Sequence, residues 1–132
     1  MAGPDPIRAD VRRARARRRT PPGSVCVYCG EQNPLLLQAH HVAGNANDKA
    51  LTVVLCRNHH HLNTLGHLDL GVDLAPAEDA LDVDLLIGVL RGLAVFFVLL
   101  AEVLVAWADR LDARVHSLDA NCPTWRQVPP AA

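Results

Sequence analysis

Aromatic side chains and cysteines are both scarce in this chain of 132 residues. It has two Trp, two Phe and one Tyr, so a small domain built from it needs a source of folding free energy other than a large apolar core. Three of its four cysteines, Cys26, Cys29 and Cys56, fall into a metal-binding pattern, and Cys122 is left over. A disulfide framework is therefore not expected, and reduced thiolates fit a cytoplasmic protein.

The N-terminal segment lacks the apolar core of a secretory signal peptide, so none is expected. Arginine dominates this segment, in contrast to a chain that is acidic from Asp69 onward and has a formal net charge of -1. A basic arm on an acidic protein is typical of a nucleic-acid contact, the alternative being a solvated tail. Pro4 and Pro6 disfavour the amphipathic helix of a mitochondrial presequence. The arm's candidate nucleic-acid-binding residues are Arg12, Arg13, Arg15, Arg17, Arg18 and Arg19.

The sequence divides into five segments. Residues 1–24 are predicted to be a disordered basic arm, residues 25–66 a metal-binding module, and residues 67–80 a linker. Within the module we expect strands over 35–42 and 51–55, then a helix from about Cys56 to Leu65 that stops at Gly66. A long helix should cover residues 81–120, and residues 121–132 should form a flexible tail. The expected fold class is α+β.

Four residues of the module have the spacing of zinc ligands. Cys26 and Cys29 are three residues apart in a turn closed by Gly30, and Cys56 and His59 are three residues apart on a predicted helix. Residues at i and i+3 share a helix face, so the second pair can bind the same ion as the first. Two such pairs close a tetrahedral site, which predicts a structural Zn²⁺.

Three further histidines surround this predicted site. His60 is about 100° round the helix from His59, so it points away from the zinc and toward the strand bearing His40 and His41. Adjacent strand residues point to opposite faces, so one of this pair is expected to hold a metal and the other to act as a base. The alternative is that these histidines serve the zinc or simply lie on the surface.

Taken together, these residues resemble the HNH endonucleases, the zinc-containing branch of the ββα-metal nucleases. The resemblance covers about residues 25–66 and rests on CVYCG, LQAHHVAGNAND and LCRNHHHL in that order. It implies a small ββα-metal module followed here by a long C-terminal helix. It also implies hydrolysis of DNA phosphodiester bonds, leaving a 5′ phosphate and a 3′ hydroxyl. The main alternative is a non-catalytic zinc protein that binds nucleic acid or acts as an accessory protein.

The resemblance assigns roles to individual residues. His41 matches the general base that activates water, and His40 and His60 match the ligands of a catalytic divalent ion, Mg²⁺ or a transition metal. The family's asparagine, which orients the base, is replaced here by Leu51. Asn47, or else Asn45, could substitute from the preceding loop, although a structural turn role is an equal alternative. Arg57 could neutralise a phosphate beside the site, or be an exposed helix residue.

Residues 85–108 are apolar apart from Arg91 and Glu102. With Asp84 and Asp109, these charges fall within about 20° of one line on a helix, which leaves the other faces apolar. We expect this surface to form a homodimer of a soluble protein, with Gly88 and Gly92 permitting close helix contact. The alternative is a membrane tether with a cytoplasmic N-terminus. However, the longest charge-free run, residues 92–101, is shorter than the ~18 residues of a simple span.

Overall fold

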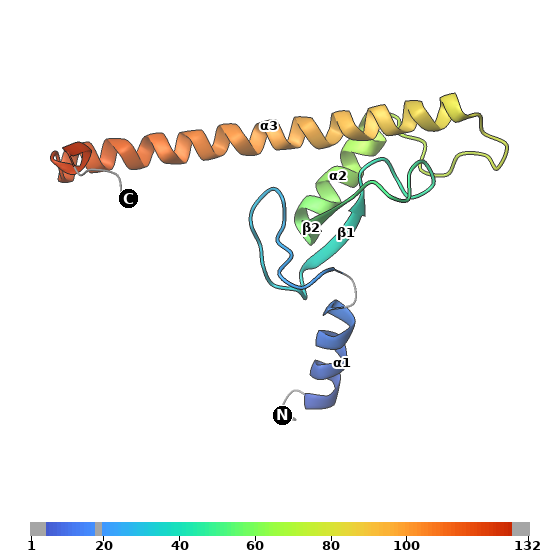
Figure 1. Cartoon of the computed structure of the whole chain (residues 1–132), viewed down its shortest axis with the longest axis horizontal. Coiled ribbons are helices and arrows are strands. Elements are labelled where there is room, and N and C mark those ends of the chain that lie inside the picture. The colour runs from blue at the N-terminus through green and yellow to red at the C-terminus, as the bar shows by residue number, and fades with distance from the viewer. Residues whose placement is uncertain (1–4, 18–19, 128–132) are drawn as a thin grey trace. The chain divides into compact units, whose positions relative to one another are not determined.

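The computed structural model describes residues 5–17 and 20–127 (Figure 1). It divides into two compact units, residues 1–99 and residues 100–132, whose boundary falls inside one long helix. The predicted α+β class is confirmed. In chain order the elements are α1 (Pro6–Arg17), β1 (Leu37–His41), β2 (Thr52–Cys56), α2 (Arg57–Asp69), α3 (Asp82–Asn121) and the 3-10 helix η1 (Trp125–Gln127).

Strands β1 and β2 form a two-stranded antiparallel sheet, and α2 follows β2 without an intervening loop. Together with the turn that precedes β1 they make up the ββα module (residues 25–69). In the sheet, His40 is paired with Val53 and His41 with Thr52. Both strands lie within one or two residues of the predicted ranges 35–42 and 51–55, and the sheet places the histidine doublet at the end of β1.

Helix α2 is longer than predicted, because Gly66 does not end it. The helix continues to Asp69 and closes at Gly71, which has a φ of +63°. A left-handed backbone conformation just beyond the end of a helix favours glycine. Gly66 has a different role. A Cβ at this position would lie 2.6 Å from the nearest methyl carbon of Val95, so glycine permits α3 to approach α2 closely.

The first part of α3 packs on the ββα module through small residues. A Cβ on Gly92 would collide with the carbonyl oxygen of Val42 and lie 2.6 Å from the Cα of Ala43. A Cβ on Gly88 would lie 2.6 Å from the side chain of Asn47. The glycine pair was expected to permit contact between two helices, but in the structure it lets α3 approach the loop that follows β1 of the same chain.

Polar contacts fix the same part of α3. The Tyr28 hydroxyl donates to the Phe96 carbonyl (3.2 Å) and accepts from Asn63 Nδ2 (3.3 Å). Arg91 Nη1 donates to the Gly71 carbonyl (2.8 Å). Tyr28, the chain's one tyrosine, is 1% exposed and therefore links the turn before β1 to both helices.

Two terminal segments differ from their predicted form. The basic arm was expected to be disordered, but the structure has helix α1 over Pro6–Arg17. Most residues of this segment are alanine or arginine, both strong helix formers, and the proline stands at its first position, where proline is tolerated. In the predicted flexible tail, η1 is held by Trp125 and Arg126, which both donate to the Asp119 carboxylate. Residues 128–132 lie outside the described part of the chain.

Candidate metal centre and histidine cluster

Local backbone structure brings the four predicted zinc ligands to one point. The Gly30 amide donates to the Cys26 carbonyl (2.8 Å), and Gly30 has a φ of +73°, which closes the turn that carries Cys26 and Cys29. Cys56 ends β2 and is the N-cap residue of α2, and His59 lies in the first turn of that helix. The strand-to-helix junction therefore supplies one ligand pair and the turn the other.

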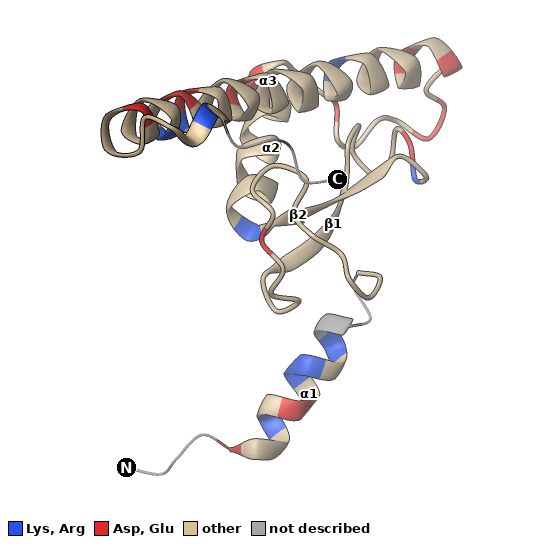
Figure 2. Cartoon of the chain, turned by 60° about the vertical axis from the view of Figure 1, so that its left-hand side comes forward, with Lys and Arg blue, Asp and Glu red and all other residues tan. Residues whose placement is uncertain are grey.

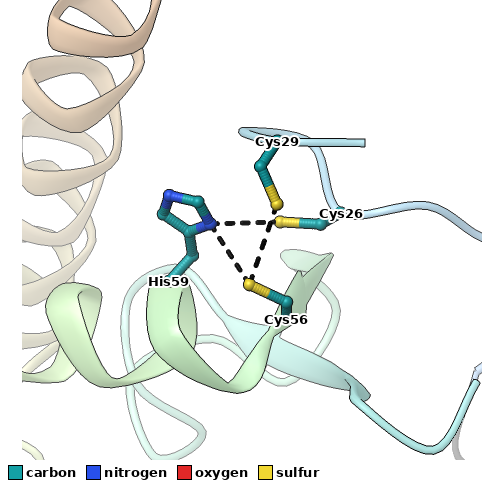
Figure 3. Close-up of side chains that lie close together, drawn as sticks. All are labelled: Cys26, Cys29, Cys56 and His59. Atoms are coloured by element: carbon teal, nitrogen blue, oxygen red, sulfur yellow. Dashed lines mark hydrogen bonds between the residues drawn. The ribbon is translucent and has the colours of Figure 1, made fainter. Parts of the chain in front are cut away.

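The spacing between ligand atoms fits a tetrahedral ion (Figure 3). His59 Nδ1 lies 3.5 Å from Cys26 Sγ and 3.2 Å from Cys56 Sγ, and the sulfurs of Cys29 and Cys56 are 3.8 Å apart. A tetrahedron with metal–ligand distances of about 2.0–2.3 Å has edges of roughly 3.3–3.8 Å. All four ligand atoms lie within 4.8 Å of one another, so the Cys3His cluster (Cys26, Cys29, Cys56 and His59) could hold a zinc ion.

The thiols of the Cys3His cluster have opposite acidities in the absence of a cation. Burial, with a smaller contribution from the neighbouring cysteines, raises the pKa of Cys29 to about 11. Burial also acts to raise the pKa of Cys26, but backbone amides of Cys56, Cys29 and Tyr28 outweigh it and the pKa is lowered. A bound divalent cation would supply the positive charge that favours the thiolate form of the cysteines in the cluster.

The surroundings of the Cys3His cluster orient its histidine. Asn63 is 1% exposed and its Nδ2 donates to the His59 carbonyl (3.0 Å) one helical turn back. The ring of Tyr28 lies 5.1 Å from the His59 ring, at 50°. Sequence analysis identified neither residue as part of the site. Their only sequence signal is position, since Tyr28 lies between the two cysteines and Asn63 four residues after His59.

A second cluster of imidazoles joins β1 to α2. The rings of His40 and His60 meet edge to face with centroids 4.7 Å apart, and the His67 ring stacks on His40 with centroids 5.3 Å apart. His40 is 5% exposed, and its Nε2 is the one buried side-chain nitrogen or oxygen in the described residues without a hydrogen-bond partner. Buried polar atoms are normally bonded, so this nitrogen has the capacity to bind a water molecule or a cation.

The electrostatics of this histidine cluster favour neutral rings. Burial and, to a smaller extent, the adjacent His60, His67 and His41 together lower the pKa of His40 to about 4. Burial also lowers the pKa of His60 and of His67. A neutral imidazole has a free lone pair for a metal ion. The ring nitrogens of these three histidines do not converge as tightly as the ligand atoms of the Cys3His cluster. In the described residues, that cluster is the one group of three or more ligands close enough together to hold a single ion.

His67 was missed by sequence analysis, although it is 2% exposed and central to the histidine cluster. Its Nε2 donates to the Val42 carbonyl (2.8 Å), so it fixes the backbone directly after His41. The sequence signal was the seven-residue spacing from His60, which places both residues on one face of α2. It was overlooked because His67 lies beyond Gly66, where the helix was expected to stop.

The candidate base and its predicted asparagine are not joined by a hydrogen bond in the described residues. His41 is half-buried at the end of β1. Asn47 Nδ2 donates to the carbonyls of Ala43 (2.8 Å) and Asp73 (2.7 Å), so both of its amide hydrogens hold loops. No hydrogen bond joins Asn47 to His41 in the described residues, and Asn45 is exposed. Asn47 therefore acts as a structural tie, which holds the backbone at Ala43, two residues after His41.

The predicted nucleic-acid-binding arginines are only partly described. Arg12, Arg13 and Arg15 are exposed on α1, where Figure 2 shows basic residues along the helix. Arg13 is 3.7 Å from Asp10, a surface pair of small energetic value. Arg57 is exposed at the first position of α2. The backbone of Arg17 belongs to α1, whereas Arg18 and Arg19 lie outside the described residues.

Comparison with known proteins gives no relative for this chain. No protein family, no characterised protein and no solved structure matches it. The functional conclusion therefore depends on the residues themselves and on their geometry.

Proposed function

We propose that the chain is a zinc-containing, metal-dependent DNA endonuclease of the HNH type. The observation that carries this proposal is the contact between His40 and His60, 4.7 Å apart, with the buried Nε2 of His40 unpartnered. His60 directly follows the zinc ligand His59, and His40 directly precedes the candidate base. The proposed ion ligands therefore lie on the strand that carries the candidate base and on the helix that carries His59.

The residues of this site have separate tasks. His41 accepts a proton from water as the water oxygen attacks phosphorus, and the bond to the 3′ oxygen breaks. That oxygen takes a proton from solvent, which leaves a 3′ hydroxyl and a 5′ phosphate. A divalent ion held by His40 and His60 would neutralise charge on the phosphate and the leaving oxygen. His67 holds the Val42 carbonyl, and so keeps the end of β1 in place beside the histidine cluster.

Substrate binding is assigned to the arginines. Exposed Arg12 and Arg15 on α1 and Arg57 on α2 contact phosphates, which carry no base identity. This arrangement supplies affinity that falls steeply with salt and shows little sequence preference.

The test is plasmid cleavage by zinc-loaded protein with Mg²⁺ or Mn²⁺, beside His41→Ala and His61→Ala. His61 is an exposed neighbour in α2 and provides a matched histidine control. We expect His41→Ala to reduce nicking by about 10²–10⁴-fold with zinc content unchanged. His61→Ala should cleave like the parent. Equal cleavage by all three proteins, or none by any, would contradict the proposal.

A second candidate function is non-catalytic nucleic-acid binding by the same zinc module. It is favoured by one observation, the commitment of Asn47 to the Ala43 and Asp73 carbonyls, which leaves no described asparagine bonded to His41. This alternative predicts that the parent and His41→Ala bind DNA equally and that neither cleaves it.

A further inference from the structure

Helix α3 carries large apolar residues at successive a and d positions of a seven-residue repeat. With Val83 as the first a position, the spacing alternates between three and four residues as far as Leu111. A strict seven-residue repeat of this length is typical of a left-handed coiled coil. We call this stripe the α3 seam; it consists of Val83, Leu86, Leu90, Leu93, Phe97, Leu100, Leu104, Trp107 and Leu111.

The α3 seam is largely uncovered in each unit. In the first unit, Leu90 is 59% exposed and Phe97 57%. In the second, Leu104 is 53% exposed and Leu111 67%. Contiguous exposed apolar surface on this scale indicates a binding surface.

The ββα module occupies the opposite face of the same helix. Its contacts are made by Gly88, Gly92 and Val95, the three buried residues of α3, and by Phe96. At about 100° per residue, Gly92 lies roughly 160° round the helix from Leu90. Folding of the module therefore leaves the α3 seam free.

The packing of the module also disfavours lipid as the occupant. The apolar window of α3 is long enough for a membrane span by composition, and only 17% of it is buried. However, Gly88, Gly92, Val95 and Phe96, which span residues 88–96, are in contact with the ββα module. Excluding that contact leaves residues 97–108, which include Glu102 and fall short of the about 20 residues that a span requires.

We propose that a second copy of this chain docks along the α3 seam, so that two α3 helices form an antiparallel coiled coil. This inference is independent of the nuclease proposal. Arg114 decides the orientation, because it takes the d position after Leu111. In a parallel pair it would oppose the same charge on the other copy. In an antiparallel pair that sets Phe97 against Leu100 of the second copy, Arg114 lies opposite Val83, between Asp82 and Asp84.

The first test measures the mass of the zinc-loaded full chain by sedimentation equilibrium, beside Leu104→Lys and Val105→Lys. These neighbours are 53% and 61% exposed, but only Leu104 belongs to the α3 seam. We expect a dimer for the parent and for Val105→Lys. Leu104→Lys should raise the dissociation constant at least tenfold with helix content unchanged.

Three results would overturn the docking proposal. The parent could be monomeric at all concentrations, the two lysine variants could associate equally, or the monomeric parent could bind neutral phosphatidylcholine vesicles. The last result would assign the exposed surface to a membrane. Leu90→Lys and Val98→Lys, 59% and 57% exposed in the parent, repeat the comparison in the first unit should Leu104→Lys fail to fold.

Charge reversal tests the orientation. Arg114→Glu should weaken the dimer about tenfold by placing like charges together, and Asp82→Arg with Asp84→Arg should restore it in the same chain. Dimerisation that is unaffected by Arg114→Glu, or a loss that the reversed aspartates do not rescue, would overturn the antiparallel arrangement.

Discussion

The first unit, residues 1–99, buries Tyr28, Leu37 and Leu55 to 2% exposure or less, whereas no described residue of the second unit is buried. Both units are rich in apolar residues, so composition does not explain the difference. The first unit has a Cys3His cluster, a sheet and glycines that allow backbones to meet. The second has one helical stretch and a short 3-10 turn.

The difference shows two ways in which a short chain with few aromatics can obtain stability. The first unit brings segments of the same chain together around a ligand cluster, so its apolar residues cover one another. A single helix has no second layer on which to pack, so its apolar face needs a partner. The predictions below perturb each unit separately, from the largest expected effect to the smallest.

Removal of the metal should have the largest effect and be confined to the first unit. The Cys56→Ser substitution removes a ligand and should abolish cooperative unfolding of the ββα module, because structural zinc supplies folding free energy directly. Cys122→Ser is the control, since Cys122 is exposed and distant in sequence from the cluster. Circular dichroism melts with and without EDTA check this. A cooperative melt for Cys56→Ser would contradict the role of the cluster.

Adding a methyl group to Gly92 should loosen α3 from the module. Its Cβ would meet the backbone of Val42 and Ala43, which cannot rotate away, so Gly92→Ala should destabilise the first unit by about 1–3 kcal/mol. At Gly66 the obstacle is the Val95 side chain, and alanine's better helix propensity, about 1 kcal/mol, offsets the clash. Urea unfolding should rank Gly66→Ala as the more stable variant. The reverse order would contradict the packing described.

The histidine cluster should make the first unit sensitive to acid. Because burial lowers the pKa of His40 to about 4, the unfolded chain binds more protons than the folded chain between pH 6.5 and 4. Stability from the neutral ring is therefore full above about pH 6.5 and is lost as the pH falls through about 4. Melting temperatures measured with excess zinc should fall across this window, and less steeply for His40→Gln. An equal slope in the variant would exclude His40 as the cause.

The smallest effect is expected at the end of the second unit. Hydrogen bonds from Arg126 and Trp125 lower the pKa of Asp119 to about 2, so their contribution is present above about pH 4 and lost as the pH falls through about 2. Asp119→Asn should release η1 and leave the first unit unchanged. Trp125 fluorescence would report the release. A changed melting temperature of the first unit in Asp119→Asn would contradict the expectation that the substitution acts on the second unit alone.

The Cys3His cluster, the two strands and the long helix could be predicted because their signals are local. Ligand spacing and short apolar, β-prone runs depend on residues within a few positions of each other. The same holds for the predicted helix over 81–120, observed as Asp82–Asn121. The assignment of His41 as base and of His40 and His60 as ion ligands stays a prediction.

Contacts between distant segments that no ligand spacing marks could not be predicted. Gly66 was expected to stop α2 because glycine commonly ends helices, but its use here depends on Val95. The role of His67 depends on its bond to Val42, 25 residues earlier in the chain. The repeat of the α3 seam is visible in the sequence, but the sequence does not show that the module covers the opposite face and leaves the seam exposed.

The most direct test of the account is X-ray absorption spectroscopy at the zinc edge on the purified, zinc-loaded chain. We predict one tightly bound zinc per chain with three sulfur neighbours at about 2.3 Å and one nitrogen at about 2.0–2.1 Å. Loss of one sulfur in Cys26→Ser and of the nitrogen in His59→Ala would complete the assignment. A zinc shell of oxygen and nitrogen alone, or a folded chain that retains no zinc, would contradict the metal centre on which the fold and the proposed function depend.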